Sequence, residues 1–194
     1  MNTIPNRIFF TGAPGSRWSG ISQNLEKLLD LNTSDRIAER EYDHKNFTGH
    51  KGAYFGRGME FESKLNLEYL DSAWSNLEKP RLIKSHDWAY QLDEIKRTFP
   101  ESWILLVYRP DILCYSWWHE AGGFNITYPN YSEYKHSINM YSEIMQQNKS
   151  ILDFAYKQNA VWYHFTQLFF EKEFNKTVTF DSEIYKDCLI SLIK

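Results

Sequence analysis

The sequence predicts an α/β protein of three layers, in which a central parallel sheet is flanked by helices. Two observations predict this class. Short continuous apolar runs, typical of strands buried on both faces, recur along the chain. Between them lie segments in which apolar residues return every three or four positions, as on one face of a helix. Alternation of strand and helix favours parallel strands joined by right-handed crossovers.

The chain has 194 residues, and we expect a single domain over residues 1–194. Hydrophobic residues make up 42% of it and aromatic residues 17%, a composition typical of a folded globular protein. A net charge of −3 gives no overall attraction to nucleic acid or to an anionic membrane surface. We therefore expect neither partner, and an anionic ligand has to be held by local basic groups.

Four apolar runs are predicted to be strands, and each is followed by a candidate helix. The runs are RIFFT at residues 7–11, RLIKS at 81–85, WILLVY at 103–108 and AVWYH at 160–164. Apolar residues at helical spacing mark the helices: Leu25, Leu28 and Leu29; Leu65, Tyr69 and Leu70; Trp88, Leu92, Ile95 and Phe99; Tyr134, Ile138, Tyr141 and Met145.

A last helix is expected over residues 182–193. Residues 33–62 and 121–132 show no helical spacing of apolar residues. Because ligands bind at the carboxyl ends of strands in sheets of this kind, we expect these two loops on the acceptor side.

Cys114 and Cys188 are the two cysteines, far apart and in segments predicted to be helical. This is typical of reduced thiols in a cytosol rather than of a disulfide framework or a zinc site. The first residues are polar, and no apolar run approaches the ~18 residues that span a bilayer. We therefore expect a cytoplasmic protein without signal peptide or anchor.

A candidate phosphate-binding loop, GAPGSRWS, runs from Gly12 to Ser19 between the first strand and an amphipathic helix. Compared with G-x-x-x-x-G-K-[ST], Arg17 replaces the second glycine and Trp18 replaces the lysine. The backbone N–H groups of residues 15–19 can still bind a phosphate at a helix N-terminus, and Arg17 can add a charge-assisted contact. This is a P-loop-type setting. The alternative is a turn that only joins a strand to a helix.

Two further groups of polar residues follow strands. Lys84 and His86 alternate onto the same side of the second strand, where a neutral imidazole can accept a proton while an ammonium stabilises transferred charge. A structural or solvated histidine is the alternative. Arg109 ends the third strand, and it and Ser116 in the next helix can both reach one phosphate. Alternatively, Arg109 pairs with Asp111 or caps a neighbouring element.

These three motifs resemble those of PAPS-dependent sulfotransferases, in the same order. GAPGSRWS is similar to the 5′-phosphosulfate loop of that family, RLIKSH to its K-[ST]-H segment, and VYRPDILCYSWW to its 3′-phosphate segment R-x-P-x-D-x-x-x-S. The resemblance covers separated blocks between residues 7 and 118.

The resemblance implies transfer of a sulfuryl group from PAPS to a hydroxyl or amine of a small-molecule or glycan acceptor, with PAP as product and no metal ion. It implies that His86 is the general base, that Lys84 contacts the sulfonate, and that Arg17 supplies the loop cation. The implied nucleotide-binding residues are Gly12, Pro14, Gly15, Ser16, Arg17, Trp18, Ser19, Arg109 and Ser116.

Four alternatives stay open on the sequence. Gly15 stands where the family has a basic residue, which also fits a nucleotide-binding module without turnover. A small-molecule or nucleotide kinase shares the strand, loop and helix, but it requires the lysine that Trp18 replaces. Glu60 or Glu62 can serve as the base instead of His86. Aromatic residues of the two loops can contact the acceptor or anchor the loops: Tyr54, Phe55, Phe124, Tyr128 and Tyr131.

Overall fold

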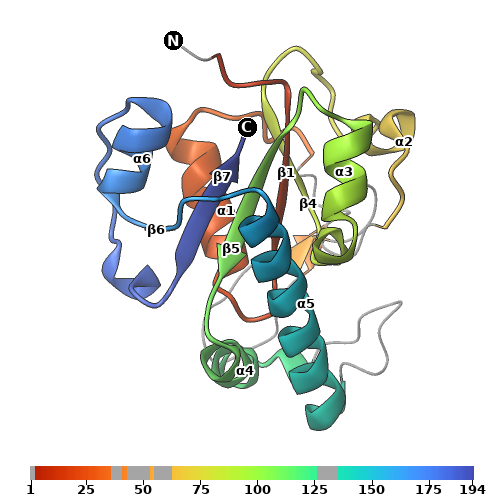
Figure 1. Ribbon diagram of the computed structural model, residues 1–194, viewed down its shortest axis with the longest axis vertical. Coiled ribbons are helices and arrows are strands. Elements are labelled where there is room, and N and C mark those ends of the chain that lie inside the picture. Colours follow the sequence, from red (N-terminus) through yellow and green to blue (C-terminus); the bar gives the residue numbers. More distant parts are fainter. Residues whose placement is uncertain (1–2, 36–40, 43–52, 55–62, 126–134) are drawn as a thin grey trace.

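The computed structural model describes residues 3–35, 41–42, 53–54, 63–125 and 135–194. Its centre is a five-stranded sheet in the order β4-β1-β5-β7-β6 (Figure 1). The strands are β1 (Arg7–Gly12), β4 (Arg81–Lys84), β5 (Trp103–Tyr108), β6 (Tyr163–His164) and β7 (Leu189–Ile193). A separate antiparallel pair is formed by β2 (Glu41–Tyr42) and β3 (Ala53–Tyr54).

The sheet is mixed, so the prediction of a parallel sheet is wrong for its second half. β1 lies between β4 and β5 and is parallel to both, but β7 is antiparallel to β5 and to β6. The helix predicted over residues 182–193 is also wrong, because β7 occupies its last part. A five-residue apolar run fits either element by its period. Pairing on both edges makes it a strand here, with Val107 opposite Ile190 and Tyr163 opposite the same residue.

Helices cover both faces of the sheet. Alternate residues of one strand face opposite layers: Ile8 and Phe10 join the core beneath α1 (Trp18–Leu28) and α6 (Gln167–Phe174). Phe9 joins the core on the other face. The remaining helices are α2 (Leu67–Asp71), α3 (Leu92–Thr98), α4 (Asp111–Glu120) and α5 (Ser137–Lys157), with short 3₁₀ turns η2 (Asp87–Tyr90), η3 (Gly123–Asn125) and η5 (Glu183–Tyr185).

Two sequence predictions are corrected in the second half of the chain. The strand predicted at residues 160–164 is confined to Tyr163–His164. The helix predicted from Ile138, Tyr141 and Met145 exists as α5, but these residues are exposed rather than in the core. Tyr134 lies outside the described residues. The buried face of α5 comprises Met140, Ile144, Gln147, Asn148, Ile151, Phe154 and Ala155.

A buried ion pair joins α1 to the edge strand β4. Lys84 Nζ lies 2.8 Å from Glu26 Oε1, and neither side chain is more than 4% exposed. Each charge would be costly to bury without the other. The pair therefore fixes α1 against this edge of the sheet, although its net contribution to the free energy of folding is small.

We therefore expect Lys84→Met to lower the free energy of unfolding by about 3 to 5 kcal/mol, because it leaves the Glu26 carboxylate buried without its cation. The double variant Lys84→Met, Glu26→Leu is expected to recover most of this loss. Urea denaturation measures both.

The exposed pair of Lys79 and Asp30, also 2.8 Å apart, is the control. Its disruption by Lys79→Met is expected to cost less than about 1 kcal/mol. Equal losses for the two lysine variants would contradict the assignment.

Candidate functional site

The loop from Gly12 to Ser19 lies between the end of β1 and the start of α1. It turns tightly, with Ser16 N–H donating to the carbonyl of Ala13 at 3.0 Å. Arg17, the residue before α1, has a left-handed backbone (φ 63°), which costs a non-glycine residue about 1 kcal/mol or more. The side chain of Arg17 makes no capping hydrogen bond, and the first turn of α1 holds no acidic residue. The positive dipole end of α1 lies at this loop.

Glycine is required at position 15 by the packing of α4 on this loop. Gly15 has φ +80°, and a Cβ placed on it would lie 2.0 Å from the carbonyl oxygen of Cys114. The basic residue that the sulfotransferase resemblance would place here has no room. Its absence therefore has a structural cause, and any cation for this loop has to come from another position.

Two guanidinium groups approach the loop. Arg17 stacks on the ring of Trp117 in α4, with Cζ 3.4 Å from the ring centroid. Burial lowers the pKa of Arg17 first, and the positive charge of Arg109 lowers it further, while Glu120 acts in the opposite direction. The fold has brought two like charges close enough to repel one another.

Arg109 holds the loop by hydrogen bonds and also places a positive charge beside it. Its Nη1 donates to the carbonyls of Gly15 at 3.1 Å and Leu113 at 2.7 Å. Its Nη2 lies 4.0 Å from the half-exposed carboxylate of Asp187. The sequence left open a phosphate contact, a pair with Asp111 or a cap for Arg109; the structure shows these two carbonyl contacts, and the phosphate contact stays a prediction.

Sequence reasoning missed Asn148, which holds this segment in place. Its Nδ2 donates to the carbonyl of Arg109 at 2.8 Å and to Asp111 Oδ1 at 2.6 Å. A single asparagine in the middle of a 21-residue helix gives no signal of such a contact in the sequence. Sequence reasoning also missed Trp117, on which Arg17 stacks, because one tryptophan in a helix gives no signal of this contact.

Several buried polar atoms around the loop have no hydrogen-bond partner among the described residues. They are Ser16 Oγ, Arg17 Nε, Trp18 Nε1 and Arg109 Nε. Buried donors are normally satisfied by protein or water, so an unexplained group of them indicates a missing partner. All four atoms can donate, and an oxyanion accepts.

His86 lies under the loop, with 5% of its surface exposed. Its Nδ1 contacts the carbonyl of Gly12, and its ring stacks on Trp18 at 4.6 Å between centroids. Because a carbonyl can only accept, Nδ1 carries the proton and Nε2 holds the basic lone pair. Burial lowers the pKa of His86 to about 4, against a smaller opposing effect of the Gly12 hydrogen bond. The imidazole is therefore neutral at pH 7.

The other predicted site residues are placed differently from their expected roles. Lys84 is level with Phe10, two residues before the end of β1, and its ammonium is paired with Glu26 rather than directed beyond the strand end. Trp18 is stacked against Phe10 and His86 and is buried. Ser116 lies on the exposed side of α4.

The predicted acceptor side falls mainly outside the described residues. Phe55, Glu60, Glu62, Tyr128 and Tyr131 lie there, as does the side chain of Tyr54. Phe124 is described, and it packs edge-on against Trp118 and Tyr115. This contact fits its alternative role as a loop anchor.

Comparisons of the chain with protein-family models, with curated proteins and with solved structures gave no significant match. In the part of the chain that the structure describes, no three His, Cys, Asp or Glu side chains are grouped to hold a metal ion. None of the described helices is long and apolar enough to cross a bilayer. The described residues bring Arg17, Arg109 and several buried donors together at the loop before α1.

We expect Gly15→Ala to destabilise the protein by about 3 kcal/mol, because the new methyl group strains the backbone and collides with the carbonyl of Cys114. Chemical denaturation measures the loss. Gln23→Ala on the exposed side of α1 is the control, expected to change stability by less than about 0.5 kcal/mol. A tolerated Gly15→Ala would mean that α4 does not pack on the loop as described.

The stability of the protein is expected to fall as the pH drops from about 6.5 to about 4. An unfolded histidine takes up its proton near pH 6.5, whereas His86 in the folded protein does so only near pH 4. In this window the unfolded chain binds more protons, so acid favours unfolding, by about 3 kcal/mol over the full window.

His86→Gln removes this titration and keeps an N–H donor for the Gly12 carbonyl. The difference in unfolding free energy between wild type and this variant is therefore expected to shrink toward pH 4. A difference that does not change with pH would show that His86 is not buried in its neutral form.

Proposed function

We propose that this chain binds PAPS at the Gly12–Ser19 loop and transfers its sulfuryl group to a hydroxyl or amine acceptor, as a P-loop-type sulfotransferase. The observation that carries the proposal is geometric: Arg17 directly precedes α1, and Arg109 donates to the carbonyl of Gly15 in the same loop. Two cations held together at the positive end of a helix are stabilised by an anion between them.

The arrangement fits a ligand with more than one anionic group. The loop follows β1, and Arg109 follows the neighbouring parallel strand β5. The loop and Arg109 therefore reach the site from different strands. Arg17 Nε and Ser16 Oγ are buried donors that an oxyanion would satisfy. PAPS supplies two anionic groups, a 5′-phosphosulfate and a 3′-phosphate.

His86 is the proposed general base. Its protonated Nδ1 donates to the carbonyl of Gly12, so Nε2 is the ring nitrogen with the basic lone pair. In the proposed step His86 Nε2 takes the proton of the acceptor O–H or N–H. The acceptor atom bonds to sulfur as the bond from sulfur to the phosphate oxygen breaks, and PAP leaves with that electron pair. Arg17 takes the role of the loop cation, because Lys84 is paired with Glu26.

A binding module without turnover is the second candidate. It is favoured by the pairing of Lys84 and by the burial of His86, both of which reduce access of reacting groups to the expected catalytic side chains. A kinase is less well supported. Trp18, in the position of the kinase lysine, is packed in the core beside Phe10.

Thermal unfolding with PAP, with 5′-AMP and with ATP plus Mg²⁺ tests the proposed ligand. PAP at 100 times its dissociation constant is expected to stabilise by about 2.7 kcal/mol, a shift of several degrees. Arg17→Gln should abolish most of this shift, because it removes the positive charge and keeps a polar side chain. Arg97→Gln on α3, whose side chain is 78% exposed, should leave it unchanged.

A response to ATP and Mg²⁺ without one to PAP would overturn the proposal in favour of a kinase. If PAP binds, release of PAP from PAPS with phenolic, sugar and amine acceptors separates the remaining candidates. Release that is lost in His86→Gln supports transfer. Binding with no release under any acceptor supports the module.

A further inference from the structure

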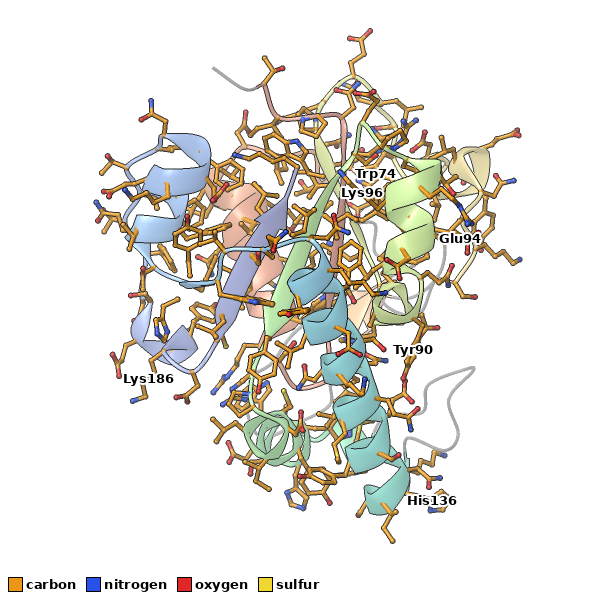
Figure 2. The ribbon with its side chains drawn as sticks, viewed as in Figure 1. Trp74, Tyr90, Glu94, Lys96, His136 and Lys186 are labelled. Atoms are coloured by element: carbon orange, nitrogen blue, oxygen red, sulfur yellow. The ribbon has the colours of Figure 1, made fainter. Side chains whose placement is uncertain are left out.

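The segment before β7 lies at the same edge of the sheet as the loop before α1. Because β7 runs antiparallel to β5, its first residue, Leu189, is level with Tyr108, the last residue of β5. The residues just before β7 therefore reach the edge at which β5 and its parallel neighbour β1 end. Figure 2 labels Lys186 in this segment, whose ammonium is paired with Glu183 at 2.8 Å. The helix predicted over residues 182–193 gave no indication of this placement.

Two residues of this segment contact the loop and the helix that follows it. The thiol of Cys188 donates to the carbonyl of Ser16, with 3.5 Å between sulfur and oxygen. Tyr185 Oη accepts a hydrogen bond of 3.0 Å from Asn24 Nδ2 on α1. Both Cys188 and Tyr185 are buried. Asp187 stands between them in the chain, so packing on either side of it holds its backbone beside the loop.

Asp187 places a negative charge next to Arg109. Its Oδ2 lies 4.0 Å from Arg109 Nη2, which is too long for a hydrogen bond, so the two groups interact by charge. The Asp187 side chain is 44% exposed and that of Arg109 is 9% exposed, so the carboxylate is the more accessible of the two groups. Nη1 of the same guanidinium donates to Gly15. The carboxylate is therefore within about 10 Å of the loop, which is the Debye length at 0.1 M salt.

The charges of this region act on one another. Burial raises the pKa of Cys188 to about 11; the positive charges of Arg109 and Arg17 act in the opposite direction, and Asp187 raises the pKa further. The three charged groups are thus close enough to affect one buried thiol that contacts the loop. The carboxylate of Glu120 likewise acts on the pKa of Arg17. Two carboxylates therefore partly balance the two arginines.

We propose that Asp187 is a specificity residue of this site, whose carboxylate disfavours a densely charged polyphosphate chain at the loop and so favours a phosphosulfate or a single phosphate. The inference rests on the proposed binding of an anionic group at the loop. A phosphosulfate carries about two negative charges and a triphosphate about four, so a nearby carboxylate repels the triphosphate about twice as strongly. Because Arg17 and Arg109 also attract the triphosphate more strongly, Asp187 offsets a preference that the arginines alone would create.

A purely structural carboxylate has a different environment in this protein. The carboxylate of Asp71 is 11% exposed and accepts hydrogen bonds from Arg81 and Arg7. Asp187 is four times as exposed, and its contact with Arg109 is longer than a hydrogen bond. Exposed ion pairs of this kind contribute little to stability. The position of Asp187 is therefore better explained by the effect of its charge on an anion than by a role in holding elements together.

The affinities of three inorganic anions, measured by titration calorimetry without divalent ions, test this charge selectivity. Sulfate, pyrophosphate and tripolyphosphate carry about two, three and four negative charges at about pH 8. We expect Asp187→Asn to tighten binding about threefold for each unit of ligand charge, which is about tenfold for sulfate and about a hundredfold for tripolyphosphate. Raising the salt concentration to about 0.5 M should reduce both gains, because salt screens the carboxylate.

Two matched variants separate charge from other causes. Asp187→Glu keeps the charge and should bind all three anions within about twofold of wild type. Asp30→Asn removes the same charge beyond the opposite end of α1, about 16 Å along the helix from the loop, and should also change each affinity by less than about twofold. Thermal unfolding of Asp187→Asn without added anion should match that of wild type, which excludes misfolding as the cause of any difference.

Three results would overturn the role of Asp187 while leaving the anion site in place. They are unchanged affinities in Asp187→Asn, equal tightening of sulfate and tripolyphosphate, or the same tightening in Asp187→Glu, which would assign the effect to side-chain shape. Binding of none of the anions by wild type or by any variant is a different result. It would overturn the anion-binding loop itself, and the proposed function together with this inference.

Discussion

The contact between Gly15 and the backbone of Cys114 is the constraint on which the arrangement of the site depends. It brings α4 against the loop closely enough that no side chain fits at position 15. Because α4 lies there, Arg109 at its start can donate to the Gly15 carbonyl, and Trp117 two turns later can support Arg17. One close backbone approach thereby sets both guanidinium positions.

The same contact explains how the site gains charge without a basic residue in the first half of the loop. The cation comes two positions later, from Arg17, and a left-handed backbone turns that residue toward α4. Burial and the nearby Arg109 make the charged state of Arg17 less favourable, as its lowered pKa indicates. The fold tolerates this cost at the loop, where an anionic ligand would offset it.

The polar interior of the fold divides into two kinds of group. Lys84 with Glu26 and Arg81 with Asp71 form buried ion pairs that hold elements together. His86, Arg17 and Arg109 contact backbone carbonyls and aromatic rings, which fix their orientation beside the loop.

The sequence by itself determined the α/β class, the strands β1, β4 and β5 and the loop after β1, since these depend on local runs of apolar residues and on glycine and proline. Its choice of Arg17, His86 and Arg109 as site residues stays a prediction. Only the tertiary structure decided the antiparallel direction of β7, since a short apolar run pairs with whichever strands lie beside it. It also decided the partner of Lys84, the platform for Arg17 and the outward side of α5. Each of these depends on contacts between segments far apart in the sequence, and the local spacing of residues does not predict such contacts.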